Sequence, residues 1–223
     1  MELITTHNIQ IIKKDIKNII LKVKPSCEVI LTIPITTDDE YINYILKKRK
    51  DWIDKKLEFF KSNNKPQIKE YVSGESFEYL GKRYRLKVIE ADEEQVKLQR
   101  GYIKIYIKNK NNFRKKEKLL NDWYMLKAKK YFEKIINQYS HIINREIKII
   151  RIRQMKTRWG SCNPSKGYIN LNSELIKKPK DCIEYVVFHE LAHLIHPNHS
   201  RSFYNYLDTY MPDWRIRKDI LEY

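Results

Sequence analysis

The sequence predicts an α+β fold in which a β-rich N-terminal part precedes a largely helical C-terminal part. Three observations lead to this prediction. Runs of β-branched residues fill the first third of the chain, two hairpin patterns follow, and long amphipathic helical patterns dominate the remainder. With 223 residues, the chain is long enough for one large domain or two small ones.

The first third is expected to form a small sheet followed by one helix. The strand patterns cover Ile9–Ile12, Ile19–Val23 and Val29–Ile33, and the segment from Thr37 to Glu40 supplies a cap and first-turn acids for a helix that runs to about Lys61. One face of this helix carries a basic group of side chains: Lys47, Lys48, Arg49, Lys50, Lys55 and Lys56. That face is a candidate phosphate-binding surface, and the simpler alternative is that it is only solvated.

The middle of the chain is expected to form two hairpins. They cover Phe77–Val88, which turns at Gly81, and Val96–Ile107, which turns near Gly101. A boundary near residue 110 then separates a β-rich N-terminal subdomain with one long helix, residues 1–110, from a C-terminal domain, residues 111–223.

The C-terminal part is expected to open with a second long helix from Phe113 to about Ile143, after which Ile147–Ile152 and Tyr168–Leu171 form short strands around a turn-rich insert at 160–167. A buried helix follows from Pro179, because Ile183, Val187, Leu191 and their neighbours form an apolar stripe.

Composition limits the classes of protein to which the chain can belong. No apolar run is long enough to span a bilayer and the start lacks the features of a signal peptide, so we expect a cytoplasmic protein. The three cysteines, Cys27, Cys162 and Cys182, are too few and too irregularly spaced for a disulfide framework. The formal charge of +17 makes nucleic acid a candidate partner, but no recognised nucleic-acid motif accompanies it, so solvated lysines are the simpler explanation of the charge.

Four of the six histidines lie between His189 and His199, and two of them stand in an H-E-x-x-H pattern. On a helix, His189 and His193 project from one face about one turn apart, so two imidazoles can meet one divalent metal ion. Glu190 stands beside them, where its carboxylate can act as general base. The pattern therefore predicts a catalytic metal site.

A third ligand has three candidates: His196, His199 and a distant carboxylate. His196 lies too far along a continuous helix, whereas Pro197 ends the helix and lets the chain turn back. His199 is therefore the best-placed candidate. The alternatives are histidines with no metal, or a structural zinc completed by another side chain such as Cys162.

Several segments resemble one known family, the YgjP-like metallopeptidases, which are relatives of the SprT-like and WLM zinc proteases. The matching segments are Met155–Cys162, Gly167–Asn172, Tyr185–Leu194, Asn198–Phe203 and Met211–Trp214, and a looser resemblance extends over roughly residues 15–221. The resemblance implies a zincin-like C-terminal catalytic domain with one Zn²⁺ per chain.

The resemblance implies that His189, His193 and His199 are the zinc ligands and that Glu190 is the catalytic base. The resemblance also implies that an extended peptide lies along an edge strand, here the strand around residues 168–172. Three further residues are candidates for substrate contact or oxyanion stabilisation, and we expect each to have a packing role instead: Arg158, Trp159 and Tyr204.

The sequence thus predicts a zinc-dependent metallopeptidase that acts on a peptide or protein, with no membrane association. Two alternatives stay open: a metal-dependent hydrolase of an anionic substrate such as a nucleotide phosphoanhydride, and a protease associated with nucleic acid. The oligomeric state is not predicted.

Overall fold

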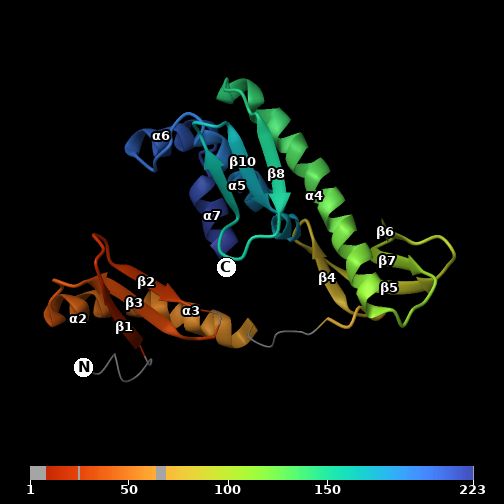
Figure 1. The fold of residues 1–223 in the computed structure, drawn as a ribbon, viewed down its shortest axis with the longest axis horizontal. Coiled ribbons are helices and arrows are strands. Elements are labelled where there is room, and N and C mark those ends of the chain that lie inside the picture. Colours follow the sequence, from red (N-terminus) through yellow and green to blue (C-terminus); the bar gives the residue numbers. More distant parts are fainter. Residues whose placement is uncertain (1–8, 25, 64–68, 223) are drawn as a thin grey trace. The chain divides into compact units, whose positions relative to one another are not determined.

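The computed structural model describes residues 9–24, 26–63 and 69–222 (Figure 1). The chain divides into two units, residues 1–68 and 69–223. The division thus lies upstream of the boundary that the sequence suggests near residue 110. The reason is that the sheet formed by residues 76–107 shares one hydrophobic core with the helices and strands that follow it.

The N-terminal unit is a three-stranded sheet with two helices. Its strands are β1 (Ile9–Lys14), β2 (Ile20–Val23) and β3 (Val29–Pro34), and β3 lies in the centre, parallel to β1 and antiparallel to β2. All three expected strands are confirmed. Val29, Leu31 and Ile33 point to one face of β3 and are fully buried in the core of this unit.

The single helix expected over residues 37–61 is wrong, because it is two helices, α2 (Asp39–Lys48) and α3 (Lys50–Asn63). The Asp38 side chain caps α2 by accepting a 2.6 Å hydrogen bond from the Tyr41 amide. The break is at Arg49, whose backbone has φ −103° and ψ 7°. Ile42 and Leu46 before the break, and Ile53 and Leu57 after it, belong to the same core as β3.

The second unit begins with a four-stranded sheet made of the two expected hairpins. The strands are β4 (Ser76–Tyr79), β5 (Lys82–Glu90), β6 (Gln95–Gln99) and β7 (Tyr102–Ile107), in the order β4-β5-β7-β6. Both turns place a non-glycine residue and the following glycine at positive φ, as in tight hairpins. The amides of Leu80 and Gly81 donate to the carbonyls of Ile176 and Lys177. These bonds join the first hairpin to the segment before the helix that carries His189, α5 (Lys180–Ala192), called the histidine helix below.

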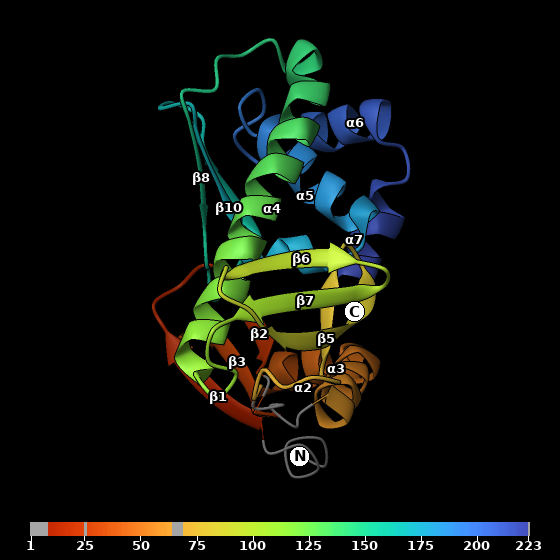
Figure 2. The ribbon, with the colours of Figure 1, turned by 90° about the vertical axis from the view of Figure 1, so that its right-hand side faces the viewer.

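The long helix α4 (Phe113–Ile143) runs the length of the second unit (Figures 1 and 2) and confirms the predicted helix. Its N-terminal half contacts the four-stranded sheet through residues such as Leu120 and Trp123, and its C-terminal half contacts α5 through residues such as Ile136 and Tyr139. A side-chain cap from Asn112 begins the helix, and Asn144, in the left-handed conformation, ends it.

A second sheet of three strands lies next to the histidine helix. Its strands are β8 (Ile149–Arg153), β9 (Gly160–Asn163) and β10 (Tyr168–Asn172), in the order β8-β10-β9. The expectation that residues 168–172 form the edge strand is wrong, because β10 is central, parallel to β8 and antiparallel to β9. The edge strand beside the histidine helix is β9, which the sequence assigned to a turn-rich insert.

The remaining elements are helical: η1 (Ser173–Lys177), α5 (Lys180–Ala192), α6 (Arg201–Tyr210) and α7 (Trp214–Glu222). Nine of the thirteen residues of α5 are buried, so this helix is central to the unit. Within the described ranges, no helix combines the length and apolar character needed to cross a membrane.

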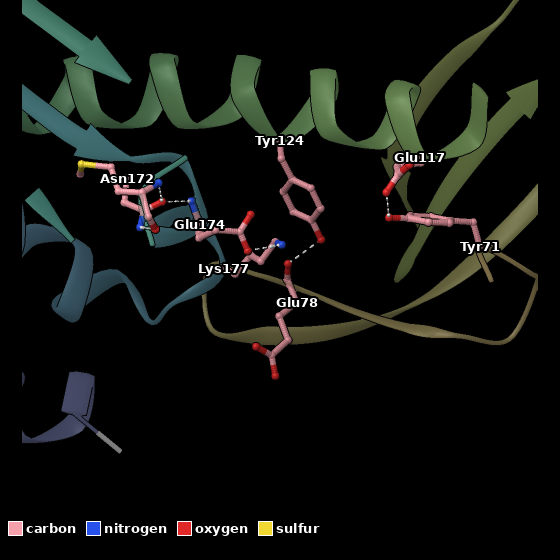
Figure 3. A network of polar contacts seen from close by, with 8 residues as sticks. Tyr71, Glu78, Glu117, Tyr124, Asn172, Glu174 and Lys177 are labelled. Carbon is pink, nitrogen blue, oxygen red and sulfur yellow. Dashed lines mark hydrogen bonds and ion pairs between the residues drawn. The ribbon is translucent and has the colours of Figure 1, made fainter. Parts of the chain in front are cut away.

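A polar network connects these elements (Figure 3). Asn172, at the end of β10, donates to the carbonyls of Met155 and Arg158 and accepts from the amide of Glu174. Tyr124 on α4 donates a 2.7 Å hydrogen bond to the carbonyl of Glu78. Asn172 is 4% exposed, so its bonds hold the segment before β9 in place in a nearly dry environment.

Candidate metal centre

The last turn of α5 positions the first two histidines. His189 lies within the helix, and His193 is the residue that ends it. The next two amides donate to carbonyls three residues earlier instead of four. Leu194 donates to Leu191 and Ile195 to Ala192, so the end of the helix is tightened into a 3₁₀ turn. The chain therefore leaves the helix before Pro197, as the sequence predicts, and returns toward it through His199.

The structure brings His189, His193 and His199 together. One nitrogen from each ring lies within 4.8 Å of the others, and the Nε2 atoms of His189 and His199 are 3.0 Å apart. His196 does not join this group, and its ring instead packs edge-on against Tyr206. In the part of the chain that the structure describes, this cluster contains no fourth His, Cys, Asp or Glu.

Hydrogen bonding and burial leave these rings ready to bind a cation. The Nδ1 atom of His193 lies 3.1 Å from the carbonyl oxygen of His196. Because a carbonyl can only accept, Nδ1 carries the proton and Nε2 keeps its lone pair. Burial, with the neighbouring histidines, lowers the pKa of His189 to about 3, and burial also lowers the pKa of His193. Both imidazoles are therefore neutral at pH 7, which is the form that ligates a metal.

Phe203 forms the floor of the histidine cluster. It is fully buried, it stacks on His193 at 4.6 Å, and it meets His189 and His199 edge-on at 5.0 and 4.9 Å. It lies in the first turn of α6, directly after the third histidine. Phe203 is thus a core residue that contacts all three histidine rings.

A row of stacked aromatic rings links two of the histidines around the outside. Tyr204 stacks on His199 at 6.2 Å and on Trp214 at 5.4 Å. Trp214 stacks in turn on Tyr185 at 6.3 Å, and Tyr185 meets His189 edge-on at 5.6 Å. Aromatic side chains from three helices, α5, α6 and α7, therefore help to fix the orientation of the rings of His189 and His199.

Trp214 is held by a polar partner at its indole nitrogen. The indole N–H donates a 2.7 Å hydrogen bond to Asp208, and the Arg215 guanidinium lies 4.5 Å from its ring. Sequence reasoning gave Trp214 no role of its own. The signal was the segment from Met211 to Trp214, but only the fold shows that Trp214 packs against Tyr185 and Tyr204, which contact the histidines.

Glu190 lies on α5 beside the first histidine and is only 6% exposed. Its neighbour is Gly160 at the start of β9, where an added Cβ would stand 2.6 Å from the Glu190 Oε1 atom. Burial raises the pKa of Glu190 to about 8, and the Arg158 cation partly opposes this rise. Gly160 thus leaves the space that the carboxyl group occupies.

Cys162 does not approach the histidines as a fourth ligand. Burial, followed by the charge of Glu190, raises the pKa of its thiol to about 12, so the sulfur is protonated at neutral pH. A thiol in this state is a poor metal ligand. Among the described residues, no fourth side chain closes the histidine cluster, and three protein ligands with an open position are typical of catalytic metal sites.

Comparison with known families identifies the chain. The sequence profile of the YgjP-like metallopeptidase domain matches residues 17–223. The chain belongs to the YgjP-like metallopeptidase family. The looser match of the first part of the chain is thereby confirmed, since the family region begins at residue 17 and covers β2, β3 and both helices of the N-terminal unit.

No curated protein matches this YgjP-like chain. Among solved structures, it is similar to the metallopeptidase zymogen abylysin of Pyrococcus abyssi, with 26% identity over 40% of this chain and 87% of that chain and a TM-score of 0.36. It is also similar to the zymogen jannalysin of Methanocaldococcus jannaschii, with 25% identity over 43% of this chain and 95% of that chain and a TM-score of 0.34.

The YgjP-like metallopeptidase is a hydrolytic enzyme by its family, and a metallopeptidase requires a divalent metal. The donor set fits such an ion, because three imidazole nitrogens converge beside an open position. Imidazole is a ligand that zinc prefers.

Proposed function

We propose that this YgjP-like enzyme is a zinc-dependent peptidase, with His189, His193 and His199 holding one Zn²⁺ and Glu190 acting as general base in a zincin-like arrangement. The observation that carries the proposal is the convergence of three histidines, with no fourth His, Cys, Asp or Glu among the described residues and with a buried carboxyl group next to them. When bound, the ion supplies a Lewis acid and lowers the pKa of water.

Glu190 would accept the proton of the attacking water and pass it to the leaving amine. Its raised pKa keeps the carboxyl group protonated near neutral pH in the absence of a cation. A divalent cation at the three histidines would favour the carboxylate form, which is the form that a base requires. Metal binding and activation of the base are therefore coupled in this proposal.

The edge strand β9 is the proposed site for an extended substrate. It starts at Gly160, against Glu190, and pairs with β10 on one side, whereas no described strand pairs with its other side. A peptide that pairs with this edge would have its backbone aligned beside the histidines.

Elemental analysis of protein purified without added zinc tests the ligand set. We expect about one zinc per chain in the wild type, and loss of most of the metal in His199→Ala. The matched control is His196→Ala, which removes a histidine from the same turn but outside the cluster, and which should keep the metal. Retention of zinc by His199→Ala, or its loss in the control, would contradict the ligand assignment.

Cleavage of a quenched fluorescent peptide library tests the reaction. Glu190→Gln should keep zinc but lower kcat by about a hundredfold or more, because the general base is lost. A zinc-loaded Glu190→Gln protein that cleaves peptides at the wild-type rate would show that Glu190 is not the base.

A further inference from the structure

A groove of about 500 Å³ lies in the N-terminal unit, outside the candidate metal centre. Its apolar wall comes from Ile19, which directly precedes β2, from Leu21 on β2 and from Ile45 on α2. A volume of this size holds a small ligand or part of a larger one. Neither the candidate peptidase chemistry nor the fold of the unit accounts for it.

Three aromatic side chains line the groove and are open to solvent. Tyr41, Tyr44 and Trp52 are 50%, 56% and 37% exposed. The rings of Tyr41 and Tyr44 lie nearly parallel, with 18° between their planes and 6.1 Å between their centroids. Large aromatic residues gathered at one exposed place indicate a binding surface, because scattered single residues would be the ordinary case.

Two cations complete the lining, and no acidic residue contributes to it. Lys48 and Arg49 stand between the aromatic residues at the junction of α2 and α3. The Lys48 ammonium donates a 3.5 Å hydrogen bond to the Tyr44 hydroxyl and lies 5.5 Å from the centre of that ring. Neither cation forms an ion pair with an acidic side chain among the described residues.

We propose that this groove binds single-stranded nucleic acid. Unpaired bases stack on exposed aromatic rings, and lysine and arginine beside the rings neutralise the phosphates that connect the bases. An acidic peptide would use the two cations but would leave the aromatic faces without comparable partners. Because α2 ends at the break at Arg49, Lys48 and Arg49 line the groove together with the tyrosines of α2 and with Trp52 of α3. The inference does not depend on the proposed peptidase function.

Fluorescence anisotropy with a labelled oligothymidine of about 15 nucleotides tests the proposal on the full chain. Tyr44→Ala should weaken binding about fivefold or more, since stacking of one base is lost. Its control is Tyr102→Ala, which removes a similarly exposed tyrosine, 42% exposed, from the other unit.

Lys48→Gln should lower the slope of log affinity against log salt by roughly 0.7 between about 50 and 200 mM salt, as for one lost phosphate contact. Its control is Lys55→Gln, an exposed lysine of α3 that does not line the groove.

Both groove variants replace exposed side chains, so circular dichroism and zinc content should match the wild type. The proposal is overturned if the groove variants bind the oligonucleotide as their controls do, since binding would then come from dispersed charge. It is also overturned if polyglutamate competes as well as the oligonucleotide does, since the groove would then be a general polyanion site. Absence of oligonucleotide binding at low salt has the same consequence.

Discussion

Replacement of Glu190 by glutamine should stabilise the metal-free protein at neutral pH. Glu190 is 6% exposed, and burial raises the pKa of its carboxyl group to about 8. In the unfolded chain the same group has an ordinary pKa of 4.5. Between these two values the unfolded state has lost its proton while the folded state keeps it, so stability falls as the pH rises from 4.5 to 8.

The expected magnitude follows from this difference. From pH 4.5 to pH 7 there are about 2.5 pH units, and each is worth about 1.4 kcal/mol, so the buried carboxyl group costs about 3 kcal/mol of stability at pH 7. Glutamine has nearly the same shape, fits the same space against Gly160 and carries no charge at any pH. Glu190→Gln should therefore be about 3 kcal/mol more stable than the wild type at pH 7, and equally stable near pH 4.5.

Thermal unfolding in the presence of a chelator, at a series of pH values, measures this effect. A gain of about 3 kcal/mol corresponds to a rise in Tm of roughly 6 to 12 °C at pH 7. The control is Glu133→Gln on α4, which changes an exposed carboxylate and should leave Tm nearly unchanged. If the difference between Glu190→Gln and the wild type does not grow between pH 5 and pH 8, Glu190 is not a buried, protonated group. Added zinc should reduce the difference, because a nearby cation stabilises the carboxylate.

Three further substitutions test the surroundings of the centre. Gly160→Ala should lower kcat/KM about tenfold or more with zinc content unchanged, because the added Cβ would meet the Glu190 carboxyl group at 2.6 Å and displace it. Trp214→Ala should weaken zinc affinity about 10- to 100-fold in a competition titration, because Tyr204 loses the ring that holds it against the third histidine. Asn172→Ala should lower the free energy of unfolding by roughly 2 to 4 kcal/mol in urea, because two carbonyls and two amides lose their buried partner.

Each of these substitutions has a matched control. Ser161→Ala changes the next residue of β9 and should keep activity near the wild-type level. Trp214→Phe keeps a stacking ring but loses the bond to Asp208, so its zinc affinity should lie between those of the wild type and Trp214→Ala. Asn170→Ala loses only a 3.2 Å bond to the Ser161 hydroxyl and should cost clearly less stability than Asn172→Ala. Equal effects in a substitution and its control would refute the corresponding explanation.

Much of the fold follows from local patterns that the sequence displays directly. The strands at the start, the two hairpins and the 31-residue helix α4 are confirmed. Each of them is encoded by a local pattern, because the alternation of apolar and polar residues, the turn residues and the helical spacing of apolar residues all involve residues a few positions apart. The same holds for His189 and His193, whose separation on a helix depends only on helix geometry. His199 follows from the position of Pro197, which limits how far the helix can continue.

Other features depend on contacts between distant segments, so local patterns could not decide them. The unit boundary at residue 68 exists because β7 and α4 bury each other's apolar residues, and β10 is central because β8 and β9 pair with its two sides.

The sequence by itself determined which side chains make up the candidate centre: three histidines whose spacing suits one metal ion, and the glutamate beside the first of them. Tertiary structure alone decided their environment. Burial of Glu190 against Gly160, and the stacking of Trp214 between Tyr204 and Tyr185, join segments that lie far apart in the chain. The pKa of a carboxyl group and the orientation of an imidazole ring depend on the groups that surround them in space. Helical spacing in the sequence says nothing about those surrounding groups.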